Sequence, residues 1–99
     1  MNKNITIPGE KIADFCKRNK IVRLSVFGSA LRDDFTPESD VDILVDFEHS
    51  QEPGFIGLAG MENELSGILN RKVDLRTPED ISRLFRKEVI QTAELQYAG

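Results

Sequence analysis

The sequence predicts a single α/β domain in which a small mixed β-sheet has helices packed on one face. Three observations lead to this fold class. The chain has 99 residues, which is the size of one domain. Short runs rich in β-branched residues alternate with segments whose apolar residues recur at helical spacing. A helix between two strands favours a parallel pair and a short loop favours an antiparallel pair, so we expect a mixed sheet.

The predicted elements start with a helix whose apolar stripe is Ile12, Phe15 and Cys16, at spacing i, i+3, i+4. The last helix has a strong start, because Thr77 can cap it and Pro78 suits its first turn. The expected elements are a helix over 8–19, strands over 21–27 and 40–47, a helix from 55 or 56 to 70, a strand over 72–76, and a helix from 77 toward 97, in which a break near 86 is compatible with the pattern.

Composition and charge are typical of a soluble globular protein, with 39% hydrophobic and 30% charged residues. The net charge of −4 argues against general nucleic-acid binding, although bound metal cations can reverse the local sign for a nucleotide. The single cysteine, Cys16, excludes an intramolecular disulfide. No apolar stretch approaches the ~20 residues of a membrane span, and no signal peptide is recognisable. We therefore expect a cytoplasmic protein with no direct nucleic-acid or membrane contact.

Three aspartates are candidates for a metal site. Asp40 and Asp42 lie two residues apart in a predicted strand, so they share one face while Val41 and Ile43 face the core. Asp74 lies in the middle of the next strand and joins them if the two strands are neighbours. Three carboxylates can hold two Mg²⁺ ions, which activate an attacking oxygen and stabilise leaving pyrophosphate. Taken alone, alternating acidic and apolar residues are more often a solvated strand face.

Gly28 and Ser29 follow the first predicted strand and form a candidate phosphate site. Glycine lets a phosphate approach the backbone closely, free N–H groups at a helical turn attract anions, and Ser29 can add a hydroxyl donor. The alternatives are a simple turn glycine and a serine that caps the following turn. Arg32 can contact a phosphate or pair with Asp33 or Asp34 on the surface, and the sequence does not decide between the two.

The spacing of these residues resembles the signature of the DNA polymerase β-type nucleotidyltransferase superfamily. It consists of Phe27-Gly28-Ser29, ten intervening residues, and Asp40-Val41-Asp42-Ile43. Together with the later Lys72-Val73-Asp74-Leu75 and Thr77-Pro78, the chain is similar to the minimal nucleotidyltransferases, or MNT proteins. The resemblance implies a polymerase β palm-like fold, metal on the three aspartates and a triphosphate on the Gly-Ser turn. Many relatives carry Arg directly after that turn, where this chain has Ala30.

The resemblance also implies an activity and a partner. MNT proteins are often encoded beside a HEPN-domain ribonuclease toxin and act as antitoxins, in some cases by transferring AMP from ATP to a tyrosine of the toxin. We therefore expect a Mg²⁺-dependent protein adenylyltransferase that forms a hetero-oligomer with a HEPN toxin, or a homodimer. The residues expected to act are Asp40, Asp42 and Asp74 as catalytic and metal-binding groups, and Gly28, Ser29 and Arg32 as nucleotide-binding groups.

Two other functions remain open from the sequence. The first is a non-catalytic antitoxin that inhibits its toxin by binding alone. The second is a transferase that acts on a hydroxyl of a small molecule, although such an enzyme usually needs a further domain to enclose its substrate. Retention of all three aspartates favours the protein adenylyltransferase, because a pure binding module does not need an acidic cluster.

Overall fold

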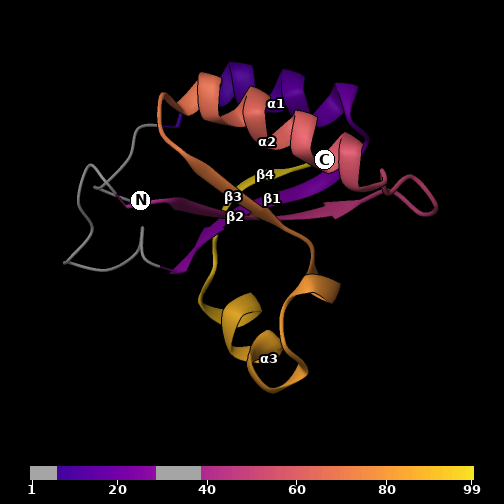
Figure 1. The fold of residues 1–99 in the computed structure, drawn as a ribbon, viewed down its shortest axis with the longest axis vertical. Coiled ribbons are helices and arrows are strands. Elements are labelled where there is room, and N and C mark those ends of the chain that lie inside the picture. Colours follow the sequence, from indigo (N-terminus) through magenta and orange to yellow (C-terminus); the bar gives the residue numbers. More distant parts are fainter. Residues whose placement is uncertain (1–6, 29–38) are drawn as a thin grey trace.

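A four-stranded sheet with strand order β3-β2-β1-β4 organises the computed structural model, which describes residues 7–28 and 39–99 (Figure 1). β1 and β2 are antiparallel, β2 and β3 are parallel, and β4 is antiparallel to β1. The predicted mixed sheet is therefore confirmed. The elements are α1 (Gly9–Arg18), β1 (Ile21–Phe27), β2 (Val41–Phe47), α2 (Phe55–Leu69), β3 (Val73–Arg76), the 3₁₀ turn η2 (Pro78–Asp80), α3 (Arg83–Thr92) and β4 (Glu94–Ala98).

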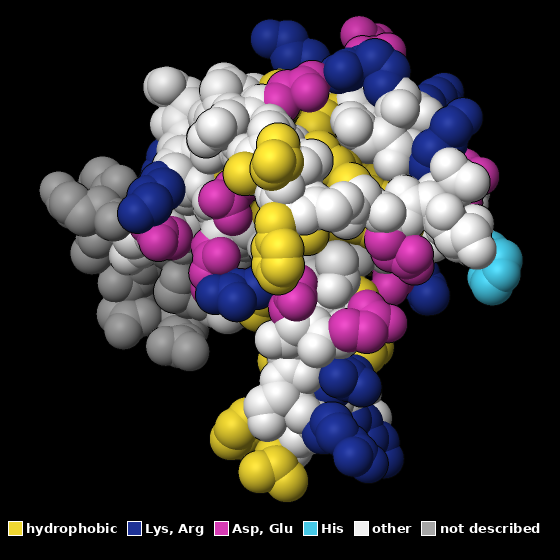
Figure 2. Space-filling model, turned by 45° about the vertical axis from the view of Figure 1, so that its right-hand side comes forward, with side chains coloured by type: hydrophobic (Ala, Val, Ile, Leu, Met, Phe, Trp, Pro, Cys, Tyr) yellow, Lys and Arg dark blue, Asp and Glu magenta, His cyan; other side chains and the backbone are white. Residues whose placement is uncertain are grey.

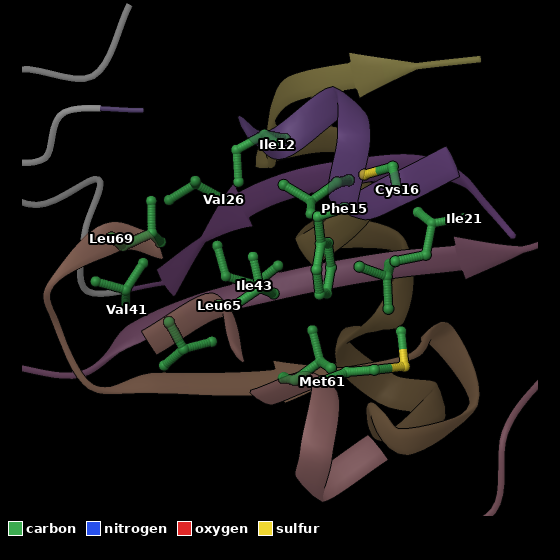
Figure 3. Packing of buried hydrophobic residues seen from close by; sticks show 14 residues of the cluster. Ile12, Phe15, Cys16, Ile21, Val26, Val41, Ile43, Met61, Leu65 and Leu69 are labelled. Carbon is green, nitrogen blue, oxygen red and sulfur yellow. The ribbon is translucent and has the colours of Figure 1, made fainter. Parts of the chain in front are cut away.

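The hydrophobic core lies between the sheet and the two helices α1 and α2, which cover one of its faces (Figure 1). Phe15 points from α1 into the centre of this cluster, where Ile43 and Leu65 lie (Figure 3). All three side chains are fully buried. Burial of a side chain of this size stabilises the fold by roughly 1.5–3 kcal/mol. Because Ile43 and its neighbour Val41 face the core, the intervening Asp42 faces the opposite side of the sheet.

The C-terminal region departs from the helix predicted from 77 toward 97, for which the sequence allowed a break near 86. Thr77 and Asp80 do form a capping pair, since the Thr77 N–H donates to Asp80 Oδ2 over 3.1 Å. They cap only the 3₁₀ turn η2, because Ile81 is extended, with φ −94° and ψ 134°. A separate helix, α3, then starts after Ser82, whose hydroxyl accepts the Leu84 N–H over 3.4 Å. The break therefore lies before α3, and α3 runs through Arg86 without interruption.

The last residues form a strand where the sequence predicted helix. Ala93 takes an extended conformation and ends α3, and β4 then adds to the outer edge of β1. Tyr97, which lies opposite Leu24 of β1, packs against the hydrophobic core. The unpaired edge of β1 offers backbone hydrogen bonds that a free helix end would lack, and this long-range pairing outweighs the local helical pattern.

The third helix, α3, lies on the face of the sheet opposite α1 and α2 (Figure 1). The expectation of helices on one face therefore holds for α1 and α2, while α3 lies over the other face. No residue of α3 is buried. Among the helices of the described ranges, none is long and apolar enough to cross a membrane.

Candidate active site

The pairing of β2 with β3 places Asp42 directly beside Asp74, which are partners in the parallel register. Neighbouring strands lie about 4.8 Å apart, so these two carboxylates can share a cation. Asp40 lies just before β2, at the same end of the strand pair. A hydrogen bond of 2.8 Å from the Val41 N–H to the Lys72 carbonyl joins the starts of the two strands there. Asp40, Asp42 and Asp74 are all half-buried.

Side chains of α2 hold the outer edge of β3 and so position Asp74. The Val73 N–H donates to Ser66 Oγ over 3.0 Å, and the Leu75 N–H donates to Glu62 Oε2 over 2.8 Å. An edge strand otherwise exposes these N–H groups to solvent or to another chain. The two bonds keep Asp74, between them in the sequence, in register with Asp42. The sequence carried no signal for this role, because it depends on how α2 lies along β3.

Asp74 already has a cationic partner in this structure. Arg76 Nη2 lies 3.1 Å from Asp74 Oδ2, and both side chains are partly exposed. The pKa of Arg76 is raised above its ordinary value, first by the hydrogen bond and charge of Asp74 and to a smaller extent by the charges of Asp80 and Asp42. The end of the sheet therefore has an acidic field in which Arg76 is the neutralising group next to Asp74.

The donor set suits Mg²⁺, because hard carboxylate oxygens are the protein ligands that this ion prefers. Within residues 7–28 and 39–99, however, no three His, Cys, Asp or Glu side chains are gathered closely enough to hold a metal ion. The predicted cluster of three aspartates is therefore present as two adjacent strand positions with Asp40 nearby, rather than as a preformed cage. Arg76 contacts Asp74 through Oδ2, so this ion pair competes with a metal ion for the charge of the Asp74 carboxylate.

Gly28 ends β1 against the carboxylate of Asp42. Its φ is +70°, a backbone conformation that residues other than glycine rarely adopt. A methyl group at this position would collide with Asp42 Oδ2 and would lie 3.2 Å from the carboxyl carbon. Glycine is thus required here for both conformation and space. The other two predicted nucleotide-binding residues, Ser29 and Arg32, lie outside the described residues.

A cleft opens beside Asp42, between α3 and the uncovered face of the sheet. Its volume is about 500 Å³. We call it the α3 cleft, and its lining residues are Phe27, Gly28, Asp42, Phe85, Glu88, Val89 and Thr92. The four residues from α3 were not predicted as part of the site. Their only signal in the sequence was the apolar periodicity of that helix, which does not tell which face of the sheet the helix covers.

Comparison with known proteins agrees with this geometry. The model of the nucleotidyltransferase domain family matches residues 10–95. The protein adenylyltransferase MntA of Thermococcus cleftensis is 33% identical over 75 residues, which cover 76% of this chain and 74% of that protein. The range matched by the family model includes β1, β2 and β3, which carry the predicted motifs.

Two solved structures share the fold. A toxin–antitoxin crystal structure with AMP-PNP superimposes with a TM-score of 0.74 at 21% identity, over 94% of this chain and 75% of that chain. A complex of MNT antitoxin with tri-AMPylated Shewanella oneidensis HEPN toxin gives a TM-score of 0.66 at 22% identity, over 92% and 70% of the two chains. The predicted fold and enzyme class are thereby confirmed, and this chain belongs to the nucleotidyltransferase domain family.

Proposed function

We propose that this single domain of 99 residues is a Mg²⁺-dependent protein adenylyltransferase and antitoxin. It transfers AMP from ATP to a tyrosine hydroxyl of a HEPN toxin in the cytoplasm. The observation that carries the proposal is the register that pairs Asp42 with Asp74, next to the glycine that closes β1. Support also comes from relatives named protein adenylyltransferase and from the similar fold of antitoxins solved with HEPN toxin or with AMP-PNP.

In this reaction the acceptor oxygen forms a bond to the α-phosphorus of ATP, the bond from that phosphorus to the bridging oxygen breaks, and pyrophosphate leaves. Asp40, Asp42 and Asp74 would hold two Mg²⁺ ions, which supply activation of the hydroxyl and neutralise developing charge on phosphate oxygens. Asp74 accepts the proton of the acceptor hydroxyl. Gly28, with Ser29 and Arg32 in the segment that follows, binds the β- and γ-phosphates.

A second function, inhibition of the toxin by binding alone, is favoured by one observation. Asp74 is engaged by Arg76, and in the described part of the chain the acidic side chains do not form a ready three-ligand site. A protein that had lost turnover could keep such an arrangement. Exposed Phe55 and Ile56 on α2, which are 92% and 91% accessible, offer apolar surface that a binding-only antitoxin would use.

Intact mass spectrometry of a HEPN toxin co-expressed with this chain separates the two functions. The toxin is incubated with ATP and Mg²⁺, with and without this chain, and tested for added AMP units. An Asp40→Asn/Asp42→Asn double variant should abolish the gain. Asp46→Asn is the matched control, because Asp46 lies on the same strand but pairs with Arg23, 3.4 Å away, at the other end of it.

A mass gain that the double variant loses and Asp46→Asn retains supports transfer through the paired aspartates. A stable complex with no gain in mass supports inhibition by binding alone. An undiminished gain with a folded double variant would overturn the metal-site assignment. Peptide mapping of the modified toxin then identifies whether tyrosine is the acceptor.

A further inference from the structure

The geometry points to the α3 cleft as the site for the nucleobase and ribose of the donor nucleotide, with Phe85 as the stacking partner of the base. This assignment rests on the proposed function and names a subsite within it. The cleft borders the acidic end of the sheet through Gly28 and Asp42, yet most of its wall comes from α3. It therefore shares Gly28 and Asp42 with the proposed phosphate and metal site and extends from them along α3.

The residues that the cleft shares with the reaction site determine the direction in which a nucleotide would lie in it. In the proposed reaction Gly28 would contact the phosphate end of the nucleotide, and Asp42 would hold a metal ion that acts at the α-phosphate. Asp74, which accepts the proton of the acceptor, does not line the cleft. The acceptor thus approaches from the β3 side, and the space over β1 and β2 remains for the nucleoside part of the donor.

The size and lining of the cleft suit a nucleoside. A volume of about 500 Å³ lies within the usual range for small-ligand sites. Phe27, Phe85 and Val89 provide apolar walls against which a flat ring can stack. Phe85 keeps 58% of its surface exposed, so core packing does not account for an aromatic residue at this position.

Charge separates the nucleoside part from the phosphates. Glu88 lines the part of the cleft formed by α3, and a carboxylate with no proposed metal repels a phosphate group. The same carboxylate of Glu88 and the hydroxyl of Thr92 can accept hydrogen bonds from an amino group of a base or from ribose hydroxyls. Figure 2 shows hydrophobic and basic side chains on the protruding part of the molecule that carries α3, below a more acidic region.

Calorimetric binding of two ligands tests the assignment. ATP contains the base, and inorganic tripolyphosphate contains only the phosphate chain, and both are titrated in the presence of Mg²⁺. Phe85→Ala should weaken ATP binding by about 5-fold to 100-fold, the usual range for loss of one aromatic–base stack, and should leave tripolyphosphate binding unchanged. Leu84→Ala is the matched control, since Leu84 is adjacent on α3, is 87% exposed and does not line the cleft.

The outcomes are distinguishable. Unchanged ATP affinity in Phe85→Ala overturns the base site, and if transfer to the toxin nevertheless falls, the cleft receives the acceptor tyrosine instead. The base site is also overturned if Phe85→Ala weakens the binding of ATP and of tripolyphosphate equally, or if Leu84→Ala weakens ATP binding as much as Phe85→Ala does. Either result would mean that the substitution acts by disturbing the fold. If the wild-type chain binds neither ligand, both the proposed function and the base site are overturned.

Discussion

Replacement of Gly28 by alanine tests whether the end of β1 is built around the carboxylate of Asp42. The backbone there has φ +70°, and a left-handed conformation costs a residue with a Cβ about 1–2 kcal/mol. The added methyl group would also collide with Asp42 Oδ2, so the carboxylate has to move. For a domain of this size, about 1 kcal/mol corresponds to roughly 4–8 °C in melting temperature. We therefore expect Gly28→Ala to melt about 4–16 °C below the wild type.

Circular dichroism gives the melting temperature, and titration with Mn²⁺, a spectroscopically useful substitute for Mg²⁺, reports on Asp42. Mn²⁺ affinity should fall in Gly28→Ala because the displaced carboxylate no longer faces Asp74. Gly60→Ala is the control, since Gly60 lies within α2 and a methyl group there meets nothing within 4 Å. Alanine in a helix interior should stabilise by up to about 1 kcal/mol. A Gly28→Ala variant with wild-type melting and wild-type Mn²⁺ affinity would refute the reasoning.

Three further variants test the site and the core. Arg76→Met removes the cation bonded to Asp74, so the affinity of the nucleotide-free protein for Mn²⁺, measured by calorimetry, should rise. The rise should be only a few-fold, because an exposed ion pair of this kind contributes ~0.2–1 kcal/mol. Unchanged Mn²⁺ affinity would argue against Asp74 as a metal ligand. Leu65→Ala, at a fully buried position, should lower the free energy of unfolding in urea by about 2–5 kcal/mol, and a loss well below that range would contradict the described core. Burial raises the pKa of the Cys16 thiol from 9.0 to about 12, so its contribution to stability is complete below pH 9 and is lost as the pH rises toward 12. Between pH 8 and pH 10 the wild type should therefore lose about 1 kcal/mol more than Cys16→Ala in urea unfolding, and equal losses would show that the thiol ionises freely in the folded state.

The parts of the site that the sequence could predict depend on local periodicity. Asp40 and Asp42 alternate with core residues, and strand geometry alone places both on the face away from the core. That Asp42 and Asp74 lie on adjacent strands also followed from the sequence, because the helix between these strands favours a parallel pair. The structure confirms that pairing. What local periodicity could not reveal was the state of Asp74, whose bond to Arg76 depends on side-chain placement within β3.

The errors occur where long-range contacts outweigh local preference. Residues 94–98 form only a short strand, and their sequence is also compatible with the end of a helix. They become β4 because β1 has a free edge, which no pattern within those five residues indicates. The periodicity of 83–92 correctly predicts a helix with an apolar side, but such a pattern does not specify which face of the sheet that side meets.

The order of the strands explains why α3 lies over the end of the sheet that carries Asp42. β3 and β4 are the two edge strands, and α3 lies in the connection between them, so this connection must pass across β2 and β1. It crosses on the face opposite α1 and α2, because that first face is already covered (Figure 1). Asp42 and Phe27, which are paired in register on the two central strands, therefore lie beneath it and line the α3 cleft. Since no residue of α3 is buried, the helix is free to adjust to a ligand at little loss of core contacts. The same connection that the sequence predicted only as a helix thus completes a site that the two central strands could not enclose alone.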